Sequence, residues 1–128
     1  MLSVIQPAAF AEKIEGDEGP NTLIGTPGND KIDSKGGNDG NIGDTIEGDG
    51  SGNDKINSGE GNDDNFGDTE VGTGSGDDKI NAGQGDDVST GNGGADKFQC
   101  GKGEDTVTDF NEEEGDKATG NCENILVS

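Results

Sequence analysis

The residues with the clearest chemical potential are aspartates that recur at fixed distances along the chain, each as the third residue of a Gly-x-Asp tripeptide. Successive aspartates of this set lie 9, 15, 9, 15, 9, 9 and 9 residues apart. They are Asp30, Asp39, Asp54, Asp63, Asp78, Asp87, Asp96 and Asp105. A short fixed period is typical of stacked structural units, and here it places a carboxylate at the same point of every unit. Because stacked carboxylates repel one another, the pattern predicts cations between the units.

The composition alone would describe a disordered acidic chain. Of 128 residues, 23% are hydrophobic and 3% aromatic, and the net charge is -21. Such a chain has too little apolar surface for an ordinary core. The regular spacing and the apolar residue that follows many of the aspartates argue against disorder. With 29 acidic residues against 8 Lys and Arg, nucleic acid and anionic membranes are excluded as expected partners. The chain also contains no apolar stretch long enough for a membrane span.

Each unit combines a glycine-rich turn with a very short strand. The 26 glycines make helix interiors costly, by roughly 1 kcal/mol each. Asp-Lys-Ile segments such as 30–32 alternate outward polar and inward β-branched side chains, as strands do. Units stacked about 4.8 Å apart would bring their aspartates together with glycine carbonyl groups. Hard oxygen ligands in this number suit calcium. The candidate carbonyl ligands belong to Gly28, Gly37, Gly52, Gly61, Gly76 and Gly85.

The repeats resemble a known family. Residues 25–32, GTPGNDKI, and 74–80, GSGDDKI, are similar to the nonapeptide G-G-x-G-x-D-x-U-x of the RTX, or haemolysin-type, calcium-binding repeats. Residues 21–26 resemble the beginning of such arrays, and residues 105–116 resemble their end. The resemblance covers roughly residues 20–117. It implies an all-β fold, a parallel β-roll, in which aspartate side chains and backbone carbonyls hold several calcium ions between turns.

The chain departs from that family pattern in two places. Both 15-residue steps contain a six-residue extension, which supplies Asp44 and Asp68 as candidate extra ligands. Either a loop bulges from the roll or the rung itself is 24 residues long. The units at Asp39, Asp63 and Asp87 also lack an apolar residue two places further on. Their strand register therefore stays open.

Other interpretations of the acidic residues are weaker. An EF-hand requires flanking helices, which the glycine content excludes. Carboxylate pairs such as Asp77 and Asp78 could serve a glycosidase, but no aromatic platform for a sugar is present. Ice binding would need a regular threonine row, and the threonines form none. Because the chain has no histidine, it also lacks an imidazole base. We therefore expect no enzymatic activity.

The two cysteines, Cys100 and Cys122, are most simply interpreted as one disulfide, which indicates an oxidising compartment. An intermolecular bridge and two free thiols are the alternatives. Near this bridge we expect an apolar cluster at the C-terminal end of the roll. Its predicted members are Phe98, Val107, Phe110, Ile125 and Leu126.

Three segments are predicted: an N-terminal apolar segment (1–19), the calcium-binding roll (20–108) and a C-terminal cap (109–128). The first segment is either the remnant of a secretory signal or a strand that pairs with a neighbouring subunit. We expect a secreted or cell-surface structural protein that folds on calcium and self-assembles head to tail into a filament, matrix or surface layer. The alternative is a monomeric secreted module for calcium binding or adhesion.

Overall fold

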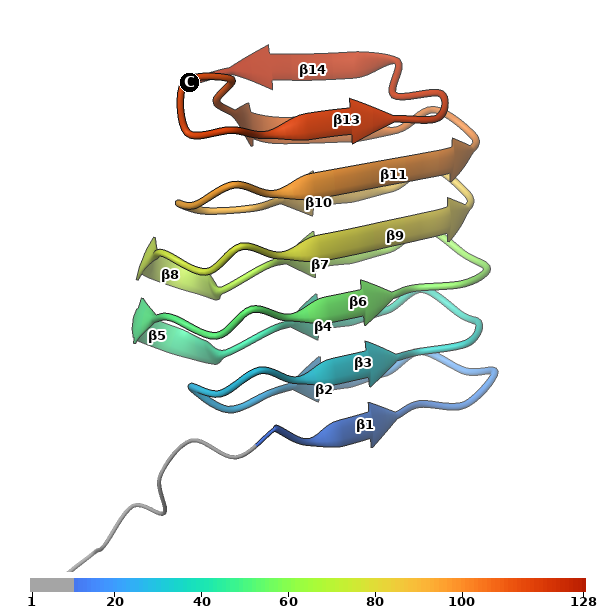
Figure 1. Cartoon of the computed structure of the whole chain (residues 1–128). Helices are drawn as coiled ribbons and strands as arrows, with labels where there is room; N and C mark the ends of the chain where they lie inside the picture. The colour runs from blue at the N-terminus through green and yellow to red at the C-terminus, as the bar shows by residue number, and fades with distance from the viewer. Residues whose placement is uncertain (1–10) are drawn as a thin grey trace, which may run out of the picture.

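The strands form a ladder of flat coils (Figure 1). The computed structural model describes residues 11–128, without the side chains of 46–49 and 72–73. Sheet A contains β1 (Lys13–Glu15), β3 (Lys31–Asp33), β6 (Lys55–Asn57), β9 (Lys79–Gln84), β11 (Lys97–Lys102) and β13 (Lys117–Thr119). Sheet B contains β2 (Thr22–Ile24), β4 (Gly40–Ile42), β7 (Asp64–Phe66), β10 (Val88–Thr90), β12 (Thr106–Phe110) and β14 (Asn124–Val127). Both sheets are parallel throughout, so the predicted all-β parallel roll is confirmed.

One nine-residue unit is half of a coil. The chain runs along a strand of sheet A, turns, returns along sheet B and turns again, so consecutive aspartates lie on opposite edges of the roll. The expectation that consecutive units stack directly is therefore wrong. The units that do stack are 18, 20 or 24 residues apart, as between Asp78 and Asp96, Asp96 and Asp116, or Asp30 and Asp54.

The six-residue extensions lengthen two coils to 24 residues. In each, the added residues form a strand that belongs to neither main sheet: β5 (Thr45–Gly50) and β8 (Thr69–Gly74). These strands pair with each other in parallel as sheet C and project from one edge of the roll (Figure 1). Of the two alternatives left open by the sequence, the longer rung is therefore the one found, with its own strand pair.

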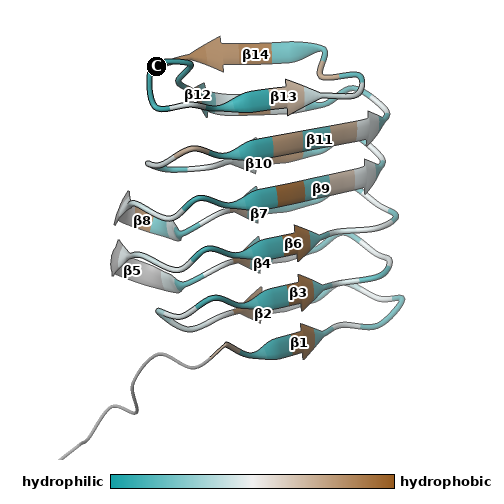
Figure 2. Ribbon diagram, in the orientation of Figure 1, coloured by the Kyte–Doolittle hydropathy of each residue, from teal (hydrophilic) through white to brown (hydrophobic). Residues whose placement is uncertain are grey.

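The apolar core is a single column of side chains between the sheets. In sheet A, strand pairing stacks Ile32, Ile56, Ile80 and Phe98 on one another, and each is at most 2% exposed. Val107 of sheet B completes this buried cluster. Figure 2 shows short hydrophobic stretches, coloured brown, on the otherwise hydrophilic strands β3, β6 and β9. Each buried side chain contributes only about 1.5–3 kcal/mol, so the core is thin.

Part of the interior is polar. The inward positions of β4 and β7 are occupied by Asn41 and Asn65, which are fully buried. Asn41 Nδ2 donates to Asn65 Oδ1 at 3.0 Å, and Ser58 Oγ donates to the same oxygen at 2.6 Å. These contacts fix the register that the missing apolar residues left open. On the sheet B side of those two coils, buried amide and hydroxyl groups therefore take the place of apolar side chains.

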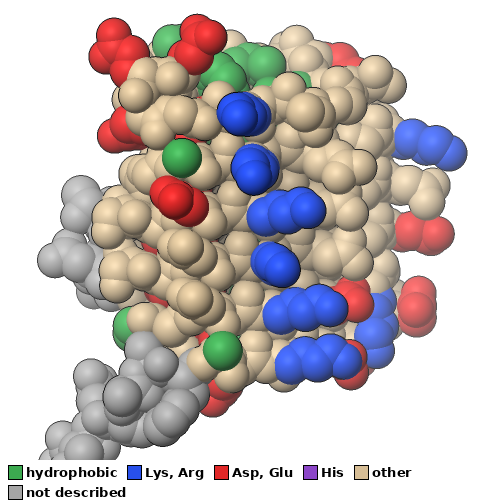
Figure 3. All heavy atoms as spheres, viewed as in Figure 1, with side chains coloured by type: hydrophobic (Ala, Val, Ile, Leu, Met, Phe, Trp, Pro, Cys, Tyr) green, Lys and Arg blue, Asp and Glu red, His purple; other side chains and the backbone are tan. Residues whose placement is uncertain are grey.

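A single file of lysines covers the outer face of sheet A. Strand pairing places six lysines in register: Lys13, Lys31, Lys55, Lys79, Lys97 and Lys117. All six are exposed, and Figure 3 shows them as one blue column on this face. Each lysine is the first residue of its strand and directly follows an aspartate or glutamate. The lysines therefore lie outward, as expected from the Asp-Lys-Ile alternation.

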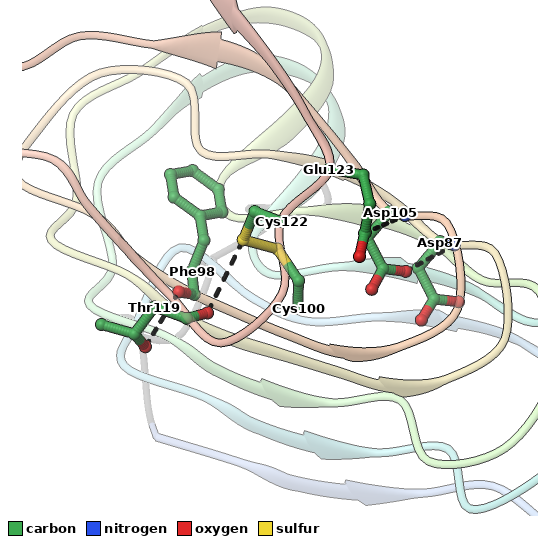
Figure 4. The surroundings of a disulfide bond; sticks show 7 residues. All are labelled: Asp87, Phe98, Cys100, Asp105, Thr119, Cys122 and Glu123. Carbon is green, nitrogen blue, oxygen red and sulfur yellow. Dashed lines mark hydrogen bonds between the residues drawn. A yellow bond between two sulfur atoms is a disulfide. The ribbon is translucent and has the colours of Figure 1, made fainter.

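The predicted disulfide between Cys100 and Cys122 is present, with a Cα–Cα distance of 5.3 Å. It ties β11 to the last turn, beside the buried ring of Phe98 (Figure 4). The expected apolar cluster around it is only partly formed, because Ile125 and Leu126 are 40% and 55% exposed. Strand β14 is the last of sheet B, so no further strand covers its apolar side chains.

Strands occur in each of the three segments predicted from the sequence: β1 precedes residue 20, and β13 and β14 follow residue 108. The division at residues 20 and 108 remains a prediction. Most of the N-terminal apolar segment, residues 1–10, lies outside the described residues.

Candidate metal centre

Two rows of acidic side chains, all buried except Glu123, run along the two edges of the roll. The extension edge carries the turns from sheet B to sheet A and is the edge from which β5 and β8 project. The opposite edge carries the turns from sheet A to sheet B. Ladder 1, on the extension edge, consists of Asp30, Asp54, Asp78, Asp96 and Asp116. Ladder 2, on the opposite edge, consists of Asp39, Asp63, Asp87, Asp105 and Glu123.

One oxygen of each ladder carboxylate has a backbone partner. Asp54 N–H donates to Asp78 Oδ1 at 2.8 Å, and Asp63 N–H donates to Asp87 Oδ1 at 2.8 Å. The same contact joins every pair of neighbours in both ladders, and Figure 4 shows the last steps of ladder 2. Each carboxylate therefore links its own coil to the preceding coil, which explains why the aspartate recurs with the repeat.

The second oxygen is buried and has no hydrogen-bond partner in most members of the ladders. This holds, among the described residues, for the Oδ2 atoms of Asp39, Asp54, Asp63, Asp78, Asp87, Asp96 and Asp105. A buried carboxylate oxygen without a partner carries a large desolvation penalty. Because the same atom is left without a partner in coil after coil, the fold needs a proton or a cation at these positions.

Glycine is required where the turns stack. The glycine two residues before most ladder aspartates, from Gly37 to Gly103, lies against the carbonyl of the equivalent glycine in the preceding coil. A Cβ on Gly52 would overlap the carbonyl oxygen of Gly28, and one on Gly76 would overlap that of Gly52. A second set of glycines borders the free oxygens: a Cβ on Gly43 would overlap Asp54 Oδ2. The space beside that oxygen is therefore kept open by the absence of a side chain.

The extension edge contains two further carboxylates. Asp44 and Asp68 begin the extensions and are both fully buried. Their carboxylates accept hydrogen bonds from Gly52 N–H and Gly76 N–H at 3.3 Å. One oxygen each from Asp44, Asp54 and Asp68 lies within 4.8 Å of the other two. Three carboxylates at this separation cannot all be ionised in a buried site without a cation.

The pKa values reflect this crowding. The pKa of Asp78 is raised to about 9, mainly by burial and also by the charges of Asp68 and Asp96. Burial is also the main reason that the pKa of Asp68 rises to about 8, with Asp44 as the next cause. On the opposite edge, burial raises the pKa of Asp87 to about 7. Without a cation, the ladders therefore hold protons at a pH where exposed aspartates are ionised.

These sites fit calcium. All the free ligand atoms are hard oxygens, which suit calcium or magnesium and disfavour softer metals. The chain has no histidine, and both cysteines are in the disulfide. Calcium accepts irregular arrangements of six to eight oxygens, whereas magnesium requires near-octahedral geometry. Bound calcium would neutralise the negative charge of the free Oδ2 atoms and give them a partner.

All ten aspartates named from the sequence as metal ligands are buried. Asp30, Asp54, Asp78 and Asp96 are brought into ladder 1, and Asp39, Asp63, Asp87 and Asp105 into ladder 2. Asp44 and Asp68 join ladder 1 through the extensions. The carbonyl oxygens of all six glycines named from the sequence face the next glycine of their stack: Gly28, Gly37, Gly52, Gly61, Gly76 and Gly85. Their role as ligands remains a prediction.

Two members of the ladders were missed from the sequence. Asp116 accepts the N–H of Asp96 at 2.9 Å, and Glu123 accepts the N–H of Asp105 at 3.0 Å. Asp116 follows a 20-residue step, which breaks the Gly-x-Asp spacing. The Asp-Lys dipeptide, which opens every later strand of sheet A, would have located it. Glu123 lies 18 residues after Asp105, which is one regular coil. It was not predicted because the repeat pattern has aspartate at this position and residue 123 is glutamate.

The chain belongs to the family of RTX calcium-binding nonapeptide repeats. The family model matches residues 8–40, 40–69 and 73–98, which together make up more than half of the chain. The resemblance deduced from the repeats is therefore confirmed, and the protein is a calcium-binding repeat protein. No characterised protein and no solved structure matches the chain at a significant level. Within residues 11–128, no helix is long and apolar enough to cross a membrane.

Proposed function

We propose that this protein is an extracellular structural repeat protein that folds when calcium binds and then assembles head to tail. The observation that carries the proposal is the row of buried carboxylate oxygens without partners on both edges of the roll. A thin apolar column cannot compensate for so many buried charges. Calcium binding to the wound form alone would stabilise that form by mass action.

An extracellular location is supported by two features. The Cys100–Cys122 disulfide is typical of oxidising compartments. Calcium modules that work outside cells bind in the range of about 10⁻⁴–10⁻³ M. A chain with a net charge of -21 would stay unwound at the low calcium level inside a cell and wind after export. We propose a structural role rather than a catalytic one.

Assembly is supported by the ends of the roll. At the C-terminal end, β14 exposes Ile125, Leu126 and Val127, the last at 76%. At the other end, β1 and β2 are the terminal strands of their sheets, and Ile24 is 39% exposed. Uncapped strand edges pair readily with another chain. Docking of β13 and β14 on β1 and β2 of a second copy would continue both sheets, and such a heterologous contact propagates as a filament.

The alternative is a monomeric secreted calcium-binding or adhesion module. The net charge of -21 favours it, because like-charged copies repel one another. The contribution of the N-terminal segment to assembly rests on residues 1–10, which lie outside the described part of the chain.

Sedimentation velocity with and without calcium tests the proposal. Head-to-tail assembly predicts large species in calcium and a small, extended monomer in chelator. Leu126→Lys with Val127→Lys should prevent assembly, whereas Val71→Lys, at another exposed apolar side chain (60%), should not. Deletion of residues 1–11 should also abolish polymers. A single small species in calcium for the unmodified protein would favour the monomeric module.

A further inference from the structure

The extension edge and the opposite edge differ in how many carboxylates each coil supplies. On the opposite edge, four successive turns contribute one buried aspartate each to ladder 2, from Asp39 to Asp105. On the extension edge, the two 24-residue coils contribute two each, one from ladder 1 and one from the extension. The nine-residue repeat alone therefore does not account for the second carboxylate that each extension supplies.

The residue that begins each extension has counterparts in the neighbouring coils. Asp44 and Asp68 follow Gly43 and Gly67, and the matching position after Gly25 is Thr26. Thr26 donates both its N–H and its hydroxyl to Asp30 Oδ2. In the first coil, the second carboxylate oxygen is thus satisfied by the protein itself. In the extended coils a second carboxylate takes the place of that donor.

The free oxygens concentrate at this point. Asp44 Oδ1 and Asp54 Oδ2 are both buried without a hydrogen-bond partner, and their side chains are at most 1% exposed. One oxygen of Asp68, which is also fully buried, lies within 4.8 Å of an oxygen of Asp44 and of Asp54. Three acidic side chains from the two extended coils therefore face one buried region.

We propose that Asp44, Asp54 and Asp68 form a separate calcium site that binds more tightly than the ladder 2 sites and fills first. This rests on the proposed calcium-dependent winding. Calcium affinity in oxygen sites increases with the number of charged ligands. The site joins the two extended coils to each other, next to the β5–β8 pair. Calcium binding at this site stabilises the middle of the roll first, and calcium binding at the ladder 2 sites then completes folding.

Isothermal titration calorimetry with calcium chloride, with far-UV circular dichroism in parallel, tests the site. The variant is Asp44→Asn with Asp68→Asn. The matched control is Asp63→Asn with Asp87→Asn, which removes the same charge from equally buried positions of ladder 2. We expect the first binding step to weaken at least tenfold in the variant and to stay unchanged in the control. The control should instead lose ions from the weaker class.

A second variant guards against a general folding defect. Asp44→Thr with Asp68→Thr copies the arrangement of Thr26, so each free ladder oxygen gains a donor from the protein. This variant should wind at high calcium and still lack the tight step. If the extension variants keep the first step, or if the control weakens it equally, the separate site is refuted while calcium-dependent winding stands. If the unmodified protein binds no calcium, the proposed function fails as well.

Discussion

The metal-free protein should wind on acidification, the reverse of ordinary acid denaturation. The pKa of Asp78 is raised from 3.8 to about 9 in the fold, so the folded chain holds this proton more firmly than the unfolded chain does. The stability from this group is complete below a pH of about 4 and is lost as the pH rises towards 9. At 1.36 kcal/mol per pKa unit, ionising Asp78 alone opposes the fold by on the order of 7 kcal/mol.

That magnitude is comparable with the whole stability of a small domain, about 5–15 kcal/mol. Asp68 adds a second opposing contribution, because its pKa is raised to about 8. Without a cation, the roll should therefore be unwound at pH 8 and gain β structure as the pH falls to about 4. With calcium bound, the carboxylates are neutralised by the ion, and the fold should persist at pH 8.

Far-UV circular dichroism of protein stripped of metal, recorded from pH 4 to pH 9, measures this effect. Asp78→Asn, which is neutral at every pH, should move the loss of β signal to higher pH. Asp86→Asn is the control, because Asp86 is exposed and asparagine occupies the matching positions Asn38 and Asn62. Equal β content at pH 4 and pH 8 in metal-free protein, or a higher content at pH 8, would refute the reasoning.

Three further predictions concern the stability of the calcium-bound roll, measured by urea unfolding. Gly52→Ala should destabilise the roll by at least about 2 kcal/mol, because the added methyl group overlaps the backbone of the preceding coil. The control, Gly40→Ala, should be nearly neutral, since nothing lies within 4 Å of its added methyl group. Lys35→Gly should stabilise by roughly 0.5–1 kcal/mol, because Lys35 has a φ of 73°; a loss of stability would contradict this. Replacing Cys100 and Cys122 with serine should remove about 3 kcal/mol, given their separation of 22 residues, and an unchanged midpoint would show that the bridge does not restrict the unfolded chain.

The stacking of the aspartates could be predicted from the sequence because their period is fixed by covalent spacing. Asp30 and Asp54 occupy equivalent positions in successive coils, and any regular winding brings such positions together. The sequence did not show that two nine-residue units make one coil. Two units make one coil because Asp30 and Asp39 lie on opposite edges of the roll. This arrangement follows from the presence of two sheets, which the repeat spacing does not reveal.

Features without a repeating residue type could not be predicted. Asn41 and Asn65 lie at inward positions that apolar residues occupy in other units, and hydrogen bonds to each other and to serine hydroxyls make their burial acceptable. The strand pair formed by the extensions was also not predictable, because pairing of β5 with β8 depends on two equal insertions lying in adjacent coils. Asp116 was not predicted as a member of ladder 1, because it lies 20 residues after Asp96 and not 18 as in a regular coil.

A crystal structure of the protein grown with calcium, with anomalous scattering recorded to locate the ions, tests the central claim most directly. Calcium bridging of the coils predicts ion density beside the free Oδ2 atoms of Asp54, Asp63, Asp78 and Asp87. A wound roll whose carboxylates keep these oxygens buried with no ion beside them would contradict it.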